Sequence, residues 1–562
     1  ISERRNLMEK STSNFKTEKV SKIIHFRPFP SEVSYLAENN NSLKQALNRL
    51  EGGTKDTPRS WFYEHKEPSW ILNQVRAELI GMKDLKIISD WDLSKSDKFA
   101  PQGGSAPLSD RLGGLEEYFL HLSCPTIIND ICWKHAKTRC IKLLSSRRPL
   151  HPLTPEQVVE RGIGEDKYNT NSGYPLFTKR KNKEAIEQAL SVASDTVYDL
   201  QYPFTLGTRA TMGKTGVDAR NIFMAPMAVN ISGQRYAQPI QDYLTEMSMR
   251  SVNRANAAPT TEFFTPWKGW EDVQYVTSQR WGLGIKFGAD YTKMDQHFNL
   301  MHAMECYDVL KTLFKREDWN GLRKSIAYPF TAPVITNLGY IDQPHALLSG
   351  SEWTNLLETV WNWIFVNYLS IKYHLEFKAA MGIGDDQLWI IGNIKPGEKS
   401  QNWLTETVIR EFEAAGLPGN PSKQEVSWTE TGFLQRFMTS EWFGLNGDMP
   451  AAGVYPLIRN VTSQVYPEKY HNDKEWDSDM FALRVIMIAE NSVQHPLFPW
   501  YVKFCAMSND NVLDFVRKGV DHAMETQNRA RGISGFLPTY NQEKQDKSIE
   551  DFETYKLMRE MI

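Results

Sequence analysis

The chain has 562 residues, enough for about three or four structural units at the usual domain size. Hydrophobic residues at 41% and charged residues at 24% match ordinary globular usage and exclude a disordered, collagen-like or coiled-coil chain. Because 65 Lys and Arg balance 68 Asp and Glu, the formal net charge is -3. Any binding of nucleic acid must therefore depend on local clusters of basic residues.

Residues 1–110 contain short helical patterns, such as Ser42–Leu50, separated by breaks at 52–53 and 101–104. We interpret this region as a separable N-terminal layer. Residues 111–285 are mainly helical and carry two basic loops, 178–183 and 208–220. Such charge runs are usually solvated surfaces.

The second basic loop also imitates a phosphate-binding P-loop. Five residues separate Gly207 from Gly213-Lys214-Thr215, whereas the phosphate cradle requires four, so an ATPase is disfavoured. The five cysteines include no C-x-x-C pair, which argues against a disulfide framework. Zinc is disfavoured for Cys124, Cys132, His135 and Cys140, because their spacing lacks paired knuckles and suits helix packing.

Between 281 and 440 the pattern changes to short strands alternating with helices, which indicates an α+β sheet domain. Residues 282–290 alternate with period two, which predicts a strand with Leu283, Ile285, Phe287 and Ala289 on one face. Asp290 ends this strand on the other face.

Residues 377–391 predict a hairpin of two apolar strands joined by the turn Gly384-Asp385-Asp386. Two adjacent acids at such a tip repel each other unless a cation neutralises them. Hard oxygen ligands suit Mg²⁺, so Asp290 and Asp385 are predicted to hold two ions for in-line phosphoryl transfer.

The longest apolar stretch, Leu356–Leu375, is interrupted by Glu358, Asn362 and Asn367. We expect a buried helix rather than a membrane span. After residue 450 the spacing is mainly helical, and the segment from about 534 is polar and highly charged.

Three segments in order resemble motifs A, B and C of viral RNA-dependent RNA polymerases. They are Asp290-x-x-x-x-Asp295, then Ser349-Gly350-x-x-x-Thr354, then Gly384-Asp385-Asp386. The spacings of about 55 and 35 residues fit a compact sheet domain with short connections. The amino-acid sequences of segments 290–295 and 384–387 most resemble those of polymerases from small segmented double-stranded RNA viruses, of picobirnavirus or partitivirus type.

Four further segments resemble the remaining motifs in the same order. Residues 171–175 resemble motif G, the basic residues between 209 and 220 resemble motif F, residues 416–423 resemble motif D, and residues 433–437 resemble motif E. A right-hand polymerase is thereby implied, with an antiparallel palm sheet, α/β fingers and a mainly helical thumb. The expected parts are a bridging layer at 1–110, fingers at 111–285 with a palm segment around 225–260, palm at 286–304, a helical insertion at 305–335, palm at 336–450, and thumb plus tail at 451–562.

The resemblance also implies roles for individual residues. Asp290, Asp385 and Asp386 would bind the metal, Asp295 would recognise the ribose 2′-hydroxyl, and Lys423 would protonate the departing pyrophosphate. Arg209, Lys214 and Arg220 would hold the triphosphate, and Ser349, Gly350 and Thr354 would form a loop that adjusts to the nucleotide. RNA contacts are expected from Ser172, Gly173, Tyr174, Pro175, Lys179, Arg180, Lys181, Lys183, Phe433, Leu434 and Arg436.

One residue departs from the family pattern. The position four residues after Thr354 often carries Asn, and this sequence has Glu358, which adds a second acid near Asp295. We hypothesise that Asn362 or Asn355 supplements the ribose recognition. Residues 534–562 are a candidate plug or priming platform, and a disordered terminus is the alternative.

The expected reaction is RNA-directed RNA synthesis for viral replication and transcription, with two Mg²⁺ ions, or Mn²⁺. The expected partners are single- and double-stranded RNA, NTPs and a capsid protein, with no membrane, for a monomer in the virion interior and host cytoplasm. The alternatives are a reverse transcriptase, disfavoured by Gly384 and Asp295, and a non-catalytic, capsid-associated RNA-binding protein.

Overall fold

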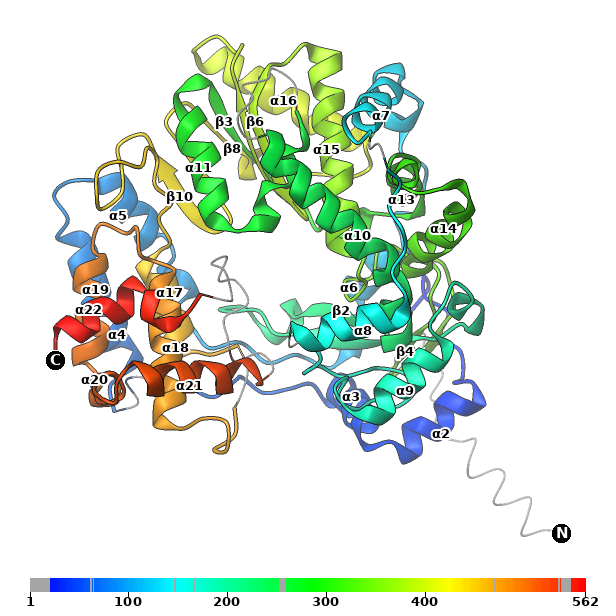
Figure 1. Ribbon diagram of the computed structural model, residues 1–562, viewed down its shortest axis with the longest axis horizontal. Helices are drawn as coiled ribbons and strands as arrows, with labels where there is room; N and C mark the ends of the chain where they lie inside the picture. Colours follow the sequence, from blue (N-terminus) through cyan, green and yellow to red (C-terminus); the bar gives the residue numbers. More distant parts are fainter. Residues whose placement is uncertain are drawn as a thin grey trace.

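The computed structural model describes residues 21–60, 63, 65–145, 148–165, 167–251, 259–468, 471–533, 536 and 547–562. The elements form three groups (Figure 1). A sheet with its helices lies at the top, a second sheet with helices lies below it, and the C-terminal helices form a separate body on the left. Over the described residues, no helix has the length and apolarity needed to cross a membrane.

The upper group is built around a four-stranded antiparallel sheet of order β6-β7-β3-β8. The strands are β3 (Ile285–Ala289), β6 (Phe377–Ile383), β7 (Asp386–Ile391) and β8 (Glu425–Ser427). Helices α15 (Thr354–Tyr373) and α7 (Ile131–Leu143) contribute to one core with Phe287 and Trp389, whose rings stack 4.8 Å apart. Helices α11 (Trp270–Arg280) and α16 (Glu398–Ala414) complete this group (Figure 1).

The predicted hairpin and the long buried helix are confirmed, and the prediction for residues 282–284 is wrong. Residues Trp281–Leu283 form a short 3-10 helix, and the side chain of Leu283 is 46% exposed. The reason is the backbone of Gly284, which packs so closely on the Ile391 carbonyl that a β-carbon would lie 2.1 Å from its oxygen. The strand therefore starts only at Ile285.

The lower group contains a second four-stranded sheet of order β2-β1-β4-β5. Strands β1 (Phe204–Arg209) and β2 (Arg220–Met224) form an antiparallel hairpin, and β1 also pairs in parallel with β4 (Val334–Thr336), which pairs with β5 (Gly339–Ile341). The surrounding helices are α2 (Ser31–Asn39), α3 (Asn41–Gly52), α6 (Leu112–Glu116), α8 (Pro155–Gly164) and α9 (Lys183–Val192). Helices α10 (Met227–Ser251), α12 (Met294–His297), α13 (Leu300–Leu310) and α14 (Trp319–Ala327) border the upper group and contribute side chains to its core.

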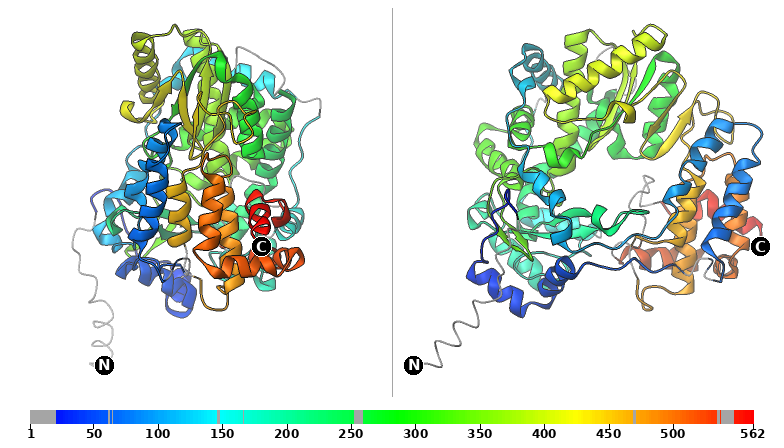
Figure 2. Two further views of the ribbon diagram at one scale, coloured as in Figure 1. Left: turned by 90° about the vertical axis from the view of Figure 1, so that its left-hand side faces the viewer. Right: turned by 180° about the vertical axis from the view of Figure 1, so that it is seen from behind.

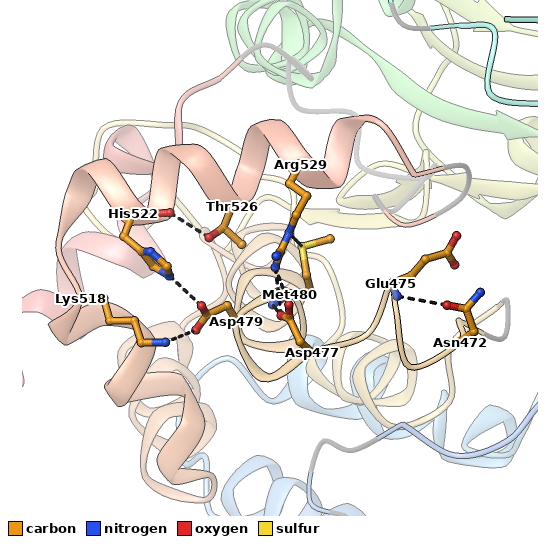
Figure 3. A network of polar contacts seen from close by, with 9 residues as sticks. All are labelled: Asn472, Glu475, Asp477, Asp479, Met480, Lys518, His522, Thr526 and Arg529. Carbon is orange, nitrogen blue, oxygen red and sulfur yellow. Dashed lines mark hydrogen bonds and ion pairs between the residues drawn. The ribbon is translucent and has the colours of Figure 1, made fainter.

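The C-terminal body combines late and early parts of the chain. Helices α17 (Leu457–Val465), α18 (Ser478–Glu490), α19 (Phe498–Met507), α20 (Asp510–Arg517), α21 (Val520–Arg531) and α22 (Glu553–Glu560) share a core with α4 (Pro68–Ile80), and α5 (Lys86–Leu93) packs on α17. The start of α18 is fixed to α20 and α21 by Asp477 with Arg529 and by Asp479 with Lys518 and His522 (Figure 3).

Two extended segments connect the N-terminal helices across the molecule. Helices α2 and α3 lie in the lower group, whereas α4 and α5 lie in the C-terminal body (Figure 2). The connecting segments pair through backbone hydrogen bonds between Thr54 and Ser105 and between Thr57 and Gln102. At the far end the buried Asp92 carboxylate accepts hydrogen bonds from the backbone of Leu457 and Ile458.

The candidate plug at 534–562 falls partly outside the described residues. Its described part, 547–562, packs on the C-terminal body, because the buried Glu490 carboxylate accepts hydrogen bonds from Glu553 and Thr554 at the start of α22. Helix α22 contacts α18, α19 and α20. This part therefore serves as a helix of that body, not as a plug.

Candidate active site

The three predicted metal ligands converge where β3 and β7 meet. Ala289 pairs with Gln387 across the antiparallel strands, so Asp290, the residue after Ala289, and Asp386, the residue before Gln387, lie side by side at the strand ends. Asp385 occupies the turn before β7. Burial raises the pKa of Asp290, and burial together with the neighbouring acids raises the pKa of Asp385 and brings that of Asp386 to about 7.

The turn that carries Asp385 is held from behind by helix α15. The Thr359 hydroxyl accepts a hydrogen bond from the Gly384 amide at 2.8 Å, and the Asn362 amide donates to the Gly384 carbonyl at 2.9 Å. Asn362 also accepts a 2.6 Å hydrogen bond from the Tyr291 hydroxyl, just after Asp290. Gly384 has φ of 58°, a left-handed conformation that suits glycine.

These contacts correct the expectation for Asn362. Its side chain is fully buried and both of its polar atoms are bonded within the protein. It cannot reach a ribose, because helix α15 directs it behind the turn. Asn355 is exposed, and its oxygen accepts a hydrogen bond from Trp267.

Glu358 lies directly beside Asp295, as its sequence position suggested. The Glu358 side chain is 4% exposed and forms a hydrogen bond with Asp295. Burial, followed by the charges of Asp295 and Asp385, raises the pKa of Glu358 well above its ordinary value. A protonated Glu358 can donate to Asp295, so the residue that replaces the family's usual Asn still acts as a hydrogen-bond donor.

The loop before α15 packs closely on β2. A β-carbon on Gly350 would lie 1.7 Å from the Phe223 carbonyl oxygen, so only glycine fits there. Thr354 donates from its hydroxyl to the Leu348 carbonyl at 2.8 Å and closes the loop. The Ser349 hydroxyl oxygen is buried and has no hydrogen-bond partner among the described residues.

The three basic residues predicted to hold the triphosphate lie on the β1–β2 hairpin and its loop. Arg209 and Arg220 are directly opposite each other in the register, and Lys214 lies in the exposed loop between them. Arg220 is close enough to the acids to lower the pKa of Asp385. Arg209 forms an exposed ion pair with Glu468, at 3.4 Å.

Lys423 ends the short 3-10 helix Pro421–Lys423 and is exposed. Its charge opposes the rise in the pKa of Asp290 that burial causes. The next residue, Gln424, clasps the backbone of Asp290: its oxygen accepts from the Asp290 amide at 2.9 Å, and its nitrogen donates to the Asp290 carbonyl at 2.7 Å. An open pocket of about 200 Å³ joins Asp290, Asp386 and Lys423.

The predicted turn of motif E is present, and two of its side chains are buried. Strands β9 (Glu430–Phe433) and β10 (Arg436–Thr439) pair around Leu434 and Gln435, and the Leu434 amide donates to Asp386 at 3.1 Å. Phe433 and Arg436 are both 2% exposed, and the Arg436 guanidinium stacks over Trp270 at 4.5 Å. Both residues nevertheless line the pocket that holds Asp290 and Asp386, so their contacts with RNA stay predictions.

The predicted template-entry segment is also largely internal. Ser172, Gly173 and Tyr174 are buried, and the Ser172 hydroxyl accepts from the Thr178 amide. The Arg180 guanidinium donates to the Asn171 carbonyl and to the Asn230 side chain, so it holds the loop together instead of facing solvent. Pro175 is half-buried, and Lys179, Lys181 and Lys183 are exposed, with Lys183 in a surface ion pair with Glu187 at 3.6 Å.

Three residues that position the site were missed by sequence reasoning. Gln424, Thr359 and Tyr291 each bond to a catalytic segment through a contact between distant parts of the chain. No local pattern marks them. Among the described residues the cysteines near His135 form no group with it that could hold a metal ion; Cys140 is buried, Cys132 is half-buried and Cys124 is exposed, so packing accounts for only part of the set.

The donor set suits a hard divalent cation. Asp290, Asp385 and Asp386 come together at the ends of two strands, although within the described part of the chain their oxygens do not all lie within 4.8 Å of one another. Burial raises the pKa of all three, and the charges of neighbouring acids add to the rise at Asp385 and Asp386, which a cation would relieve. Arg220 near Asp385 and Lys423 near Asp290 supply positive charge for binding phosphates.

Comparison with known proteins agrees with this geometry. No family model matches the chain. The sequence is 24% identical over 518 residues, 86% of this chain and 90% of the relative, to a protein of human picobirnavirus described as a potential RNA-dependent RNA polymerase. The crystal structure of the RNA-dependent RNA polymerase of a human picobirnavirus superimposes with a TM-score of 0.76 at 20% identity, over 93% of this chain and 97% of that one.

A second crystal structure, an insertion-loop deletion mutant of that polymerase, superimposes with a TM-score of 0.74 at 19% identity over the same shares. The predicted resemblance to picobirnavirus-type polymerases is confirmed. The predicted fold class is confirmed as well: the chain has the right-hand polymerase fold, α+β in class, with an antiparallel sheet that carries the acids.

Proposed function

We propose that this protein is an RNA-directed RNA polymerase that adds ribonucleotides to a growing RNA strand and releases pyrophosphate. The observation that carries the proposal is the meeting of Asp290, Asp385 and Asp386 at the ends of β3 and β7, with Asp295 one turn away. The 24% identity to the picobirnavirus protein over most of both chains supports it.

Asp290 and Asp385, assisted by Asp386, would hold two Mg²⁺ or Mn²⁺ ions. When bound, such ions lower the pKa of the RNA 3′-hydroxyl and stabilise charge on the α-phosphate and the leaving group. Asp386 can contribute one oxygen, because its other oxygen accepts the Leu434 amide. Arg220 on the β1–β2 hairpin would bind the triphosphate, together with Arg209 opposite it and Lys214 in the loop beyond them.

Lys423 would donate a proton to the departing pyrophosphate. Its exposed ammonium lies near Asp290 on the wall of the pocket, where it can approach a phosphate without displacing another side chain. Gln424 keeps this lysine in register with Asp290 through its two hydrogen bonds.

Asp295 would select ribose by accepting a hydrogen bond from the 2′-hydroxyl. Glu358, whose pKa is raised by burial and by the charges of Asp295 and Asp385, would donate to one side of the Asp295 carboxylate and leave its other oxygen for the sugar. A deoxyribose would leave this oxygen without a partner, which is the basis for rejecting it. Among the asparagines, only the exposed Asn355 remains a candidate for assisting.

Lys179, Lys181 and Lys183 would contact the template backbone through salt-sensitive phosphate contacts, since they are exposed beside the motif G loop. We further propose that the protein acts as a monomer within a capsid, on both single- and double-stranded RNA. Size-exclusion chromatography and co-purification with the capsid protein would test these two points.

The decisive experiment measures incorporation of labelled NTPs on single-stranded RNA by the wild type and by Asp385→Ala. The matched control is Asp448→Ala, at an exposed aspartate of a loop outside the pocket. Loss of synthesis by at least 1,000-fold, or about 4 kcal/mol, is expected for Asp385→Ala alone. Equal products from both variants would contradict the catalytic assignment, and equal use of dNTPs and NTPs would favour the reverse transcriptase alternative.

A further inference from the structure

Two histidines and a glutamate form a cluster that the proposed reaction does not use. Glu117 begins the short 3-10 helix 117–119, His121 lies four residues later, and His297 ends α12, two residues after Asp295. One ligand atom from each lies within 4.8 Å of the other two. The two imidazole rings stack with centroids 4.0 Å apart.

The hydrogen bonds of this cluster leave one nitrogen of His297 available as a ligand, and the stacked rings must turn before both imidazoles can face one ion, because each lone pair lies in its ring plane. His297 uses its Nδ1 toward the Lys293 carbonyl at 3.0 Å, which makes Nδ1 the protonated nitrogen and leaves the Nε2 lone pair free. Such a bond from the second ring nitrogen to a carbonyl is what orients metal-binding histidines. The His121 Nε2 and a Glu117 oxygen lie 2.7 Å apart, and a metal would replace the shared proton.

The backbone around the cluster is already fixed. The buried Asn299 donates from its side chain to the carbonyls of His121 at 3.1 Å and Ser123 at 2.9 Å, and it also caps α13. The Gln296 side chain donates to the Gly114 carbonyl at 3.4 Å. Two chain segments about 180 residues apart are thus held together, and only side-chain rotation is needed to bring the ligands together.

We propose that Glu117, His121 and His297 form a binding site for a divalent transition metal, with Zn²⁺ as the best-matched ion. Two imidazole nitrogens and one carboxylate oxygen are a ligand set that zinc accepts, with water in the fourth position. Tetrahedral bonds of about 2.0–2.1 Å place ligand atoms about 3.4 Å apart. Donors that are now as far apart as 4.8 Å would approach by up to about 1.4 Å, and the His121 and Glu117 donors, now 2.7 Å apart, would separate by about 0.7 Å.

The side chains of Glu117 and His121 are 40% and 34% exposed, so an ion can enter from solvent. The bound metal joins segment 112–123 to α12, the turn that carries Asp295. By holding α12, the metal would fix the position of Asp295 and so affect ribose selection. This effect rests on the proposed function, whereas metal binding itself does not. An ordinary ion pair beside stacked rings is the competing description, and it predicts no metal affinity.

The test titrates Zn²⁺ into the full-length, metal-stripped protein against a chromophoric chelator, with excess Mg²⁺ to occupy the site of the acids. Wild type is expected to bind one equivalent, and Co²⁺ in its place is expected to give the visible absorption of a tetrahedral nitrogen and oxygen site. His297→Ala and Glu117→Gln are each expected to weaken binding by at least tenfold. His135→Ala, at an exposed histidine outside the cluster, is the control and is expected to bind like wild type.

Circular dichroism verifies that each variant is folded, and Glu117→Gln changes only an exposed carboxylate should His297→Ala fail to fold. Zn²⁺ is also expected to raise the Tm of wild type and of His135→Ala, but not that of the two cluster variants. No stoichiometric binding by wild type, or undiminished binding by the folded cluster variants, would overturn the proposal. None of these measurements depends on RNA synthesis, so their outcome is independent of the polymerase assignment.

Discussion

Replacing Asn362 by Ala tests whether this residue positions the catalytic acids or recognises the nucleotide. The change removes the bond to the Gly384 carbonyl and the bond from the Tyr291 hydroxyl, both buried. Each group left without a partner costs about 1–3 kcal/mol, so the free energy of unfolding should fall by about 2–6 kcal/mol. The turn that holds Asp385 would also lose one of its two supports from α15.

The assay measures kcat/KM for an NTP and for the matching dNTP on an RNA template. Displacement of the turn by about 1 Å costs on the order of 100-fold in rate for both substrates. The ratio of the two is expected to stay unchanged, because Asn362 is fully buried behind the turn. Asn355→Ala, on the exposed side of the same helix, is the contrasting variant.

A double-mutant cycle with Tyr291→Phe isolates the shared hydrogen bond. Because the Tyr291 hydroxyl donates to Asn362 at 2.6 Å, the two substitutions should be non-additive by about 1–2 kcal/mol in urea unfolding followed by tryptophan fluorescence. Additive costs would refute this reasoning. So would a change of tenfold or more in the NTP to dNTP ratio of Asn362→Ala with an unaltered NTP rate.

Three further predictions concern other parts of the fold. Asp92→Ala should lower the free energy of unfolding of the C-terminal body by about 3–5 kcal/mol in urea titrations, because the buried carboxylate accepts two helix amides and His495; the exposed Asp90→Ala should cost little, and equal costs would contradict the link. Burial lowers the pKa of His302 to about 4 from the ordinary 6.5, so the folded state resists protonation and stability is lost as pH falls from 6.5 toward 4. Between pH 7 and 5 the free energy of unfolding should fall by about 2 kcal/mol through His302, and His302→Gln should not show this loss. Urea titrations at the two pH values measure it, and the same pH dependence in both proteins would contradict the assignment to His302. Gly350→Ala places a methyl group 1.7 Å from the Phe223 carbonyl oxygen, so it should reduce RNA synthesis by at least tenfold, and full activity would show that the loop adapts freely.

The acids and the strands that carry them could be predicted from sequence because their signals are local. Alternation places Asp290 at a strand end, and apolar runs on either side of Gly384-Asp385-Asp386 specify a hairpin. The resemblance then relates the two segments in space. Glu358 could also be identified from the sequence, because it lies four residues after Thr354, and the structure places it beside Asp295.

What failed was the assumption that residues in a motif point toward the substrate. Arg180 and Asn362 lie in motif segments, and both use their side chains to hold those segments together. Burial depends on which distant segment covers a residue, and sequence spacing carries no such information. Gln424 was missed for the same reason, because its partner lies 134 residues earlier.

The two hydrogen bonds between Gln424 and the backbone of Asp290 couple the position of a proposed metal ligand, Asp290, to that of a proposed proton donor, Lys423. A side-chain amide bonded to both backbone groups of Asp290 leaves that residue and Lys423 little freedom to shift separately. In the proposed reaction, activation of the attacking hydroxyl and release of the leaving group would then advance in step. A nucleotide bound in the wrong position would disturb both steps at once, so discrimination against it would depend on the two hydrogen bonds between Gln424 and Asp290.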